Sequence, residues 1–455
     1  MDEKQLNYEF MSILSESHPG LTFEEYRDSC IFLLFYQYLC LRYDDKLEDS
    51  YKLEAMVRLA IRGKLQMPSF LQFMEGASPF IHLACKKFQL TDLSFYHHLQ
   101  GVQSLEKQKS YARFFRKFIK KIDGWDCKAL LLEHYPQLFG NLLEEFARAK
   151  KETYISEELL GLYRMIFQQT NPAPKKVFVP DFQYGVLYRT ISGEVDEPEI
   201  YGYETREDFI EILQIVCFMH NIPEESVHLY LKKDWDQQMI HSESFDSVAV
   251  FMPDGVEAGK LISSVDTNVA RELLRSTAKG EFPFILSALP LLNESGAMAV
   301  VLPSALLYRE GKEAQVRRYL VEEANCLDMI MLLPDHLFHS TGQKEVLLFF
   351  RKNRTEEYVM FFDCSEMESF RTEQLNSIET AWREQSTIPG FCSCVDRESM
   401  KENDYNLNLP RYIKKSFKMA QIDLDARRKR IEEIDRELEE IEKRIAMYKR
   451  DLELI

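Results

Sequence analysis

The sequence predicts an α/β protein with a largely parallel sheet, preceded by a helical region and followed by one long helix. Three observations predict this architecture. Helix-type apolar patterns fill residues 1–150, short apolar segments alternate with helix-type stretches over 151–415, and a regular apolar repeat marks 416–455. Strand–helix alternation is typical of a sheet with helices on both faces. We therefore expect three regions, with boundaries near residues 150 and 415.

The composition is that of a folded globular protein. The chain has 455 residues, enough for two or three domains, of which 45% are hydrophobic and 29% charged. Its longest apolar run, residues 31–40, is too short to span a bilayer, and its first ten residues contain no apolar signal-peptide core. We expect a cytoplasmic protein without membrane contact.

Charge and cysteine content exclude several classes of site. A net charge of −17 argues against a free-standing, non-specific DNA coat, because duplex binding needs Lys and Arg to neutralise phosphates. It does not exclude a local basic patch, or DNA contact through a partner. The nine cysteines form no C-x-x-C pair, and Cys392 with Cys394 has no second pair at zinc spacing. We expect reduced thiols and no metal.

The first region, residues 1–150, is predicted to be helical. Residues 22–43 are rich in apolar and aromatic side chains and contain no Gly or Pro, and residues 53–65 and 111–122 place apolar residues at helix spacing. A basic cluster interrupts three phenylalanines of the last stretch; it consists of Arg113, Arg116, Lys117, Lys120 and Lys121. Two interpretations stay open for it, a solvated helix face and a phosphate-contacting face.

The second region contains the predicted strands. Short apolar, β-branched or aromatic segments lie at residues 176–180, 199–204, 245–253, 297–303, 326–334 and 345–352. Ligands of parallel sheets bind outside the carboxyl ends of the strands.

The third region predicts a long helix with a narrow apolar stripe. Its apolar residues step by three and four; they are Ile431, Ile434, Leu438, Ile441, Ile445, Tyr448, Leu452 and Ile455. Nearly every position between them is charged. A helix packed on its own domain would also show an apolar stripe, but a narrow stripe with charged flanks favours a coiled-coil contact.

Four segments resemble one known family. Residues 296–354 contain VVLP, LP-x-x-LF-x-x-TG and LLFFRKN in the order and spacing of the methyltransferase domain in modification subunits of bacterial type I restriction-modification systems. The string NDYNLNLPRY at residues 403–412 is similar to that family's signature before its C-terminal helix. Residues 22–45 resemble its helical N-terminal domain, and the terminal heptad helix is similar in placement. The resemblance extends over nearly the whole chain.

The resemblance implies a fold and a chemistry. The fold is α/β: a helical N-terminal domain (1–150), a Rossmann-like class I methyltransferase domain (151–415) and a C-terminal coiled-coil helix (416–455). The activity implied is methylation of the N-6 amino group of adenine in duplex DNA, with S-adenosylmethionine as the donor. A separate specificity subunit reads the target, and the modification subunits dock on its helices.

The segments that the resemblance assigns to the donor pocket depart from the family's pattern. Tyr154 keeps an aromatic residue, but Ile155 and Ser156 stand where the family has Thr and Pro. In the glycine-rich turn only Pro180 and Gly185 match. Phe, Gln and Tyr at 182–184 add bulk where the family leaves space for the donor.

Two carboxylates remain near the pocket. Asp181 lies two residues after the position of the family's leading acid. Glu204 stands where the family has a carboxylate for the ribose hydroxyls. Glu204 has a second interpretation, as a helix-starting residue, because carboxylates are favoured there in any helix.

The catalytic segment departs furthest. The family's N-P-P-F is replaced by Phe251, Met252, Pro253 and Asp254. Phe251 has no amide to accept the target's amino protons, and Asp254 cannot stack on a flipped base. We therefore predict that no catalytic residue is intact. We expect no cofactor, or S-adenosylmethionine if the pocket still functions.

Three functions are consistent with these residues. In the first, the chain is an inactive subunit. Its C-terminal helix binds a specificity subunit or an active modification subunit, and it reaches DNA through that complex. In the second, it is an active adenine methyltransferase in which Asp181, Glu204 and Asp254 take rearranged roles. A third hypothesis, another ligand in the crevice, has no recognisable phosphate loop to support it.

Overall fold

The structure is a computed structural model of the chain. It describes residues 3–15, 18–85, 94–125, 128–150, 155–180, 198–204, 207–231, 244–251, 268–276, 281–337, 344–414 and 441. Contacts divide the chain into two units, Met1–Ile413 and Lys414–Ile455. Of the expected coiled-coil stripe only Ile441 is described, and it is 50% exposed. The coiled coil itself lies outside the described residues, and the three-region division stays a prediction.

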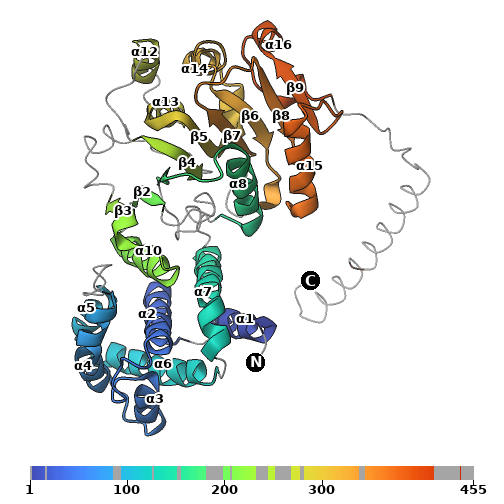
Figure 1. The fold of residues 1–455 in the computed structure, drawn as a ribbon. Coiled ribbons are helices and arrows are strands. Elements are labelled where there is room, and N and C mark those ends of the chain that lie inside the picture. Colours follow the sequence, from blue (N-terminus) through green and yellow to red (C-terminus); the bar gives the residue numbers. More distant parts are fainter. Residues whose placement is uncertain are drawn as a thin grey trace, which may run out of the picture. The chain divides into compact units, whose positions relative to one another are not determined.

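The N-terminal part of the first unit is helical, as predicted (Figure 1). Its helices are α1 (Glu3–Met11), α2 (Phe23–Arg42), α3 (Leu53–Ile61), α4 (Met67–Cys85), α5 (Ser94–Gln100), α6 (Leu105–Asp123) and α7 (Lys128–Lys150). Helix α2 begins with a capping box, in which the Thr22 side chain accepts from the Glu25 N–H and the Glu25 carboxylate accepts from the Thr22 N–H at 2.7 Å. No described helix is both long enough and apolar enough to span a membrane.

One nine-stranded sheet forms the rest of this unit. Its strands are β1 (Lys176–Phe178), β2 (Glu199–Glu204), β3 (Val227–Leu231), β4 (Phe245–Phe251), β5 (Leu292–Pro303), β6 (Leu327–Leu332), β7 (Glu345–Arg351), β8 (Tyr358–Asp363) and β9 (Cys392–Asp396). They lie in the order β3-β2-β1-β4-β5-β7-β6-β8-β9. The largely parallel sheet is confirmed, with one refinement: β7 runs antiparallel to β5 and β6, and β9 to β8.

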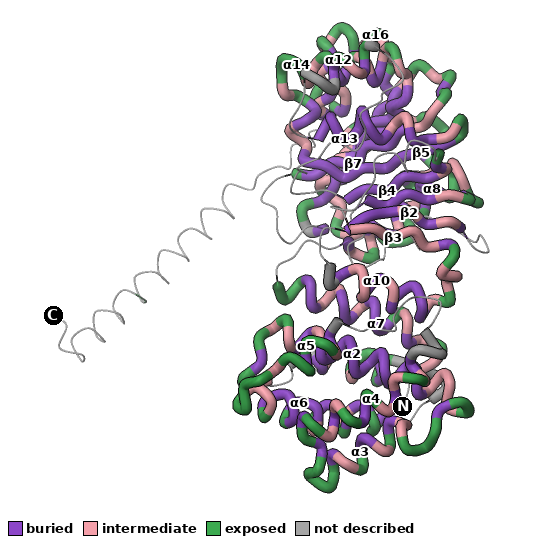
Figure 2. The backbone as a smooth tube through the Cα atoms, turned by 90° about the vertical axis from the view of Figure 1, so that its left-hand side faces the viewer, coloured by how far each residue is buried: buried purple, intermediate pink, exposed green. Residues whose placement is uncertain are grey.

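Helices cover both faces of the sheet, as expected for this class. One face packs against α8 (Glu157–Thr170), α10 (Glu207–Met219) and α15 (Thr372–Arg383). The other packs against α12 (Asn268–Ser276), α13 (Glu281–Ala288), α14 (Lys312–Arg318) and α16 (Arg397–Glu402). The central strands β4 to β7 are buried over most of their length (Figure 2). Burial on both sides explains why they appear in the sequence as nearly continuous apolar runs.

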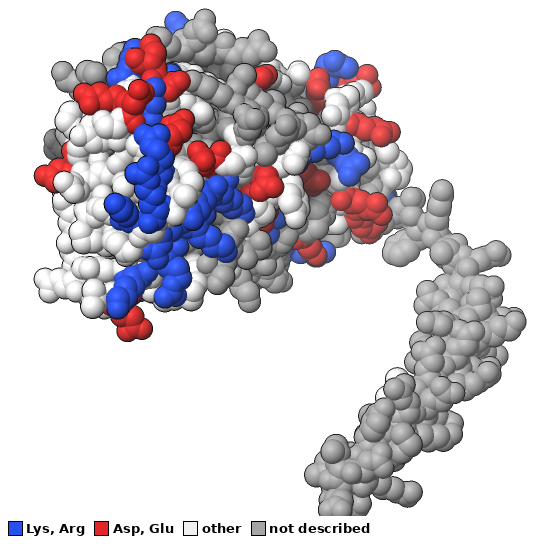
Figure 3. Space-filling view, turned by 90° about the horizontal axis from the view of Figure 1, so that it is seen from below, with Lys and Arg blue, Asp and Glu red and all other residues white. Residues whose placement is uncertain are grey.

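The exposed side of α3 and α6 is basic. Helices α3 and α6 lie at the bottom of Figure 1. Seen from below, Lys and Arg side chains form a broad band on this side of the molecule (Figure 3). We call this surface the basic face; it comprises Arg58, Arg62, Lys64, Lys109, Arg113, Lys117 and Lys120, all exposed. Phe114, Phe115 and Phe118 of α6 are buried on the opposite side of the helix. The cations of α6 therefore lie on an outward helix face.

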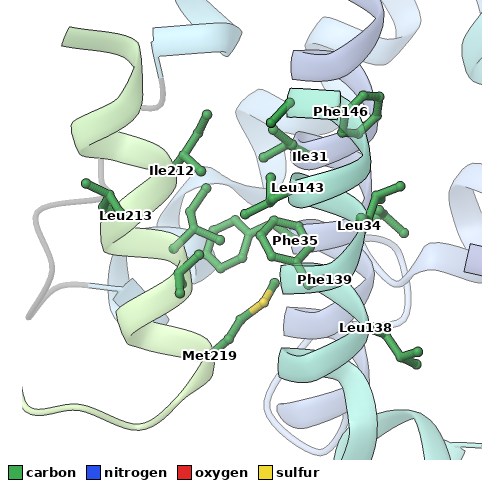
Figure 4. Packing of buried hydrophobic residues seen from close by; sticks show 14 of the residues in the cluster. Ile31, Leu34, Phe35, Leu138, Phe139, Leu143, Phe146, Ile212, Leu213 and Met219 are labelled. Atoms are coloured by element: carbon green, nitrogen blue, oxygen red, sulfur yellow. The ribbon is translucent and has the colours of Figure 1, made fainter. Parts of the chain in front are cut away.

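The helical region shares its core with the sheet domain. Side chains of α2, α7 and α10 interlock around Phe35, Phe139, Leu143 and Met219 (Figure 4), and they belong to the same hydrophobic cluster as one face of the sheet. The Tyr38 hydroxyl of α2 donates to the carbonyl of Met219 at 3.2 Å. The two parts are thus joined by apolar packing as well as by the chain.

The signature string at residues 403–412 is held by one buried arginine. Arg317, on α14, is 2% exposed. Its guanidinium donates to the carbonyls of Tyr405, Leu306 and Arg309, each at 2.8 Å. Burial lowers the pKa of Arg317 to about 10, which leaves it charged at neutral pH. The string therefore has a structural role: it closes the sheet domain over α14 and the end of β5.

Candidate functional site

The strand order reverses between β1 and β4. From β1 the chain proceeds outward to β2 and β3, and from β4 it proceeds the other way to β5. Ligands of doubly wound sheets bind outside the carboxyl ends of the strands at such a reversal. Phe178, the last residue of β1, is level with Tyr201 and Val248, so β2 and β4 each continue three residues beyond β1 toward this edge. Three predicted site residues lie at this edge: Pro180, Glu204 and Phe251.

Glu204 is a buried carboxylate at this edge. It is the last residue of β2, is 2% exposed, and lies beside Leu231 of the edge strand β3. Among the described residues that end β1, β2 and β4, it is the one charged side chain. A carboxylate at such a depth requires hydrogen-bonding or charged partners, because desolvation otherwise costs several kcal/mol. Both interpretations of Glu204, a ribose contact and a helix-starting acid, stay predictions.

Pro180 and Phe251 contribute apolar surface. Pro180 is buried, and the preceding residue, Val179, donates its N–H to the Tyr201 carbonyl at 2.9 Å. Phe251 is 1% exposed and belongs to the same hydrophobic cluster as Val177 and Val179. Its ring therefore takes part in the core, and it offers no hydrogen-bond acceptor at the end of β4.

Helix α8 supports the end of β4. The Ser156 side chain accepts from the Leu159 N–H at 3.3 Å and so caps the helix, while Ile155 is buried. The Tyr163 hydroxyl donates to the Val250 carbonyl at 2.6 Å. Burial raises the pKa of Tyr163 far above its usual range, so it remains a proton donor. The serine that departs from the family's pattern therefore has a local structural reason.

Asp246 fixes the opposite ends of the same strands. At the start of β4, its Oδ2 accepts from the N–H groups of Lys175 and Lys176 at 2.7 and 2.8 Å. Its Oδ1 accepts from the Asn293 side-chain amide. One carboxylate thus ties β1 and β5 to β4. Our sequence reasoning missed this residue; an acid opening a predicted apolar strand was the available signal.

The remaining predicted site residues lie outside the described residues: Tyr154, Asp181, Gly185, Met252, Pro253 and Asp254. The structure therefore brings together Pro180, Glu204 and Phe251 and leaves the full pocket a prediction. Among the described residues, no group of His, Cys, Asp and Glu could hold a metal ion.

The described residues match S-adenosylmethionine at one position. Glu204 lies at the level and strand end where a ribose-binding carboxylate is expected. The Phe251 side chain has no polar atom. A single matching group does not make a donor site.

Comparisons with known proteins agree with this architecture. The family model described as N-6 DNA Methylase matches residues 177–420. The type I restriction enzyme MpnII methylase subunit of Mycoplasma pneumoniae is 26% identical over 255 residues, 51% of this chain and 47% of that protein. The MjaVII methylase subunit of Methanocaldococcus jannaschii is 26% identical over 268 residues, 54% of this chain and 45% of its own length. The matched part of the chain thus spans about half the length of these relatives.

A solved structure shows the same fold. The type I restriction-modification system methyltransferase subunit from Streptococcus thermophilus superposes with a TM-score of 0.71 at 17% identity, over 91% of this chain and 100% of that one. This likeness confirms the predicted class, a Rossmann-like methyltransferase domain with a helical N-terminal region. Because the family model matches more than half of the sequence, the chain belongs to the N-6 DNA methylase family.

Proposed function

We propose that this chain is a modification subunit of a type I restriction-modification complex that contributes assembly or regulation and transfers no methyl group itself. Family membership and the two curated relatives, both named methylase subunits of type I restriction enzymes, support the first part. The residues at the candidate site support the second part, the absence of methyl transfer.

Phe251 is the observation on which the second part rests. It ends β4, where the resemblance places an asparagine that grips the target amino group, and its ring is 1% exposed in the core. A preorganised polar group at a reacting centre contributes about 3–4 kcal/mol to the transition state, roughly a hundredfold to a thousandfold in rate. A phenyl ring offers none of this stabilisation. The predicted replacement of the stacking residue by Asp254 adds a second defect.

Of the described candidate residues, Glu204 is the one that could still bind the methyl donor. If S-adenosylmethionine binds at this edge, Glu204 would hold its ribose hydroxyls, and the donor would supply the methyl group. We propose that the bulky residues at 182–184, which the resemblance places in the donor pocket, prevent productive binding of S-adenosylmethionine. The retained carboxylate then serves the packing of β2 against its neighbours.

Titration calorimetry and methyl transfer test the proposal together. The purified chain is titrated with S-adenosylmethionine, then mixed with a specificity subunit, duplex DNA and methyl-labelled donor. An active type I methylase subunit is the positive control. We expect neither heat of binding nor label on DNA. Micromolar binding followed by label on adenine would refute the inactive assignment.

The alternative, an active adenine methyltransferase, is favoured by one observation, the buried carboxylate at the end of β2. Glu204→Gln distinguishes the two. In an active enzyme the substitution would weaken donor binding at least tenfold, because a ribose hydroxyl loses its charged acceptor. In the inactive subunit the calorimetric trace stays flat for both proteins, and only stability changes.

We further propose that residues 416–455 make the subunit contact as a coiled coil. Leu438→Lys together with Ile445→Lys would place charges in the predicted apolar stripe. Glu439→Lys, at a predicted outward position, is the matched control. We expect the double variant, and not the control, to lose co-purification with a specificity subunit or an active modification subunit. Retained co-purification would assign the contact to another surface.

A further inference from the structure

We propose that the basic face of α3 and α6 binds the phosphate backbone of duplex DNA without reading its sequence. This surface is separate from the carboxyl-end crevice. The inference does not depend on whether the crevice accepts a methyl donor.

The geometry of α6 gathers its cations on one side. Lys109, Arg113, Lys117 and Lys120 are spaced by four, four and three residues, which places them along one face of a helix. All four are exposed. At a rise of about 1.5 Å per residue, they extend over roughly 17 Å. Projected on the duplex axis, the phosphates of one strand recur about every 3.4 Å, so a row of this length spans the axial rise of about five of them.

Helix α3 widens this row into a surface. Arg116 of α6 donates to the carbonyl of Leu65 at 3.1 Å, which fixes the end of the α3 segment beside α6. Arg58, Arg62 and Lys64 are exposed there. Figure 3 shows the resulting band of Lys and Arg, with Asp and Glu mainly at its margins. Two rows of cations suit a polyanion of the width of a duplex better than a single small anion.

The cations of the basic face are largely uncompensated. Among the described residues, no ion pair forms at Arg58, Arg62, Lys64, Lys109, Arg113 or Lys120. Elsewhere on the helical region cations do meet carboxylates, as in the Lys107–Glu25 pair at 2.6 Å. The whole chain has a net charge of −17, so acids are abundant but not placed here. Like charges held close together repel, and a polyanion that binds them relieves this cost.

The three acids of these two helices, Glu54, Glu106 and Asp123, lie in terminal turns, with Glu106 in the first turn of α6. Burial and the charge of Glu54 raise the pKa of Asp123, which indicates that these two residues are neighbours. Glu54 is in the first turn of α3, and Asp123 is the last residue of α6. The basic face is therefore bounded by acids and not interrupted by them. Membership of a DNA methylase family makes duplex DNA the polyanion that this surface would meet.

Fluorescence anisotropy with a labelled duplex of arbitrary sequence tests the proposal on the full chain. The patch variant combines Arg62→Gln, Lys109→Gln, Arg113→Gln and Lys120→Gln. The control variant combines Lys312→Gln, Arg371→Gln, Arg383→Gln and Lys401→Gln, which are exposed on the sheet domain. Both variants change the net charge equally, so a general charge effect would weaken both alike. Circular dichroism verifies that each variant folds.

We expect salt-sensitive binding by the wild type and the control. The patch variant should bind at least tenfold more weakly at about 50 mM salt. Its log–log salt slope should be smaller by up to about 3.6, since each of the four phosphate contacts removed contributes about 0.9. No binding by the wild type, or equal losses in both variants, would overturn the proposal. So would single-stranded RNA competing at lower concentrations than duplex DNA. No methyl donor enters this assay. A negative anisotropy result therefore does not bear on the proposed function, and a negative calorimetry or methyl-transfer result does not bear on the basic face.

Discussion

Replacing Arg317 by methionine tests whether one side chain holds the signature string in place. Methionine keeps a long apolar stem but removes all three hydrogen bonds to the carbonyls of Tyr405, Leu306 and Arg309. A hydrogen bond from a charged donor contributes about 1.5–3 kcal/mol net. Three would sum to roughly 4–9 kcal/mol, but methionine also avoids burying a charge, which offsets part of this sum. We expect a loss of about 3–5 kcal/mol in the free energy of unfolding.

The adjacent Arg318 provides a matched control. It is exposed and pairs with Glu322 at 2.7 Å, one turn along the helix. Exposed pairs contribute up to about 1 kcal/mol, so Arg318→Met should destabilise the chain by less than that. Urea unfolding followed by circular dichroism measures both variants. A loss below about 1 kcal/mol for Arg317→Met, or equal losses for the two, would refute our account of the string.

Three further predictions concern the stability of the helical region and of the candidate site. Burial raises the pKa of Glu25, but hydrogen bonds from Lys107 and the Thr22 N–H outweigh it and lower the pKa overall. The stabilising effect of Glu25 is therefore complete above its unfolded pKa and is lost as pH falls through its folded pKa. In unfolding titrations, the free energy of unfolding lost on acidification should be about 0.5–1 kcal/mol larger for the wild type than for Glu25→Gln. Tyr163→Phe leaves the helix packed but removes the donor to the carbonyl at the end of β4, and thermal unfolding should report a loss of about 1–2 kcal/mol; no change would mean that this bond contributes nothing. Phe251→Asn should cost about 3–5 kcal/mol by urea unfolding without producing methyl transfer, and activity gained with little loss of stability would contradict the core role of the ring.

Much of the fold was predictable because it depends on local patterns. Residues 22–43 predict α2 almost to the residue, since Thr22 caps it and Tyr43 ends it. The apolar strands β1, β2 and β4 to β7 were found for the same reason. Strands β3, β8 and β9 were not. All five residues of β3 are only half-buried at the sheet edge, and its histidine interrupts what would otherwise be an apolar run.

The candidate site was predictable where the family resemblance assigns residues to strand ends. Pro180, Glu204 and Phe251 were placed by that resemblance, and a parallel sheet brings such ends to one edge. The supporting contacts were not predictable. Tyr163 meets β4 from 87 residues away, and Arg317 meets the signature string from 88. Nothing local in the sequence marks either side chain as a donor to a distant carbonyl.

The packing of α2 and α7 against α10 limits how this protein can move. Fully burying a side chain such as Phe35, Phe139, Leu143 or Met219 contributes about 1.5–3 kcal/mol. Separating the helices from α10 exposes part of each of these four, so it would cost at most roughly 6–12 kcal/mol from them. That is comparable with the whole stability of a typical domain, about 5–15 kcal/mol. Helix α10 begins three residues after Glu204. A pull on the helical region is therefore transmitted to the rim of the crevice, and the two should melt in one cooperative step.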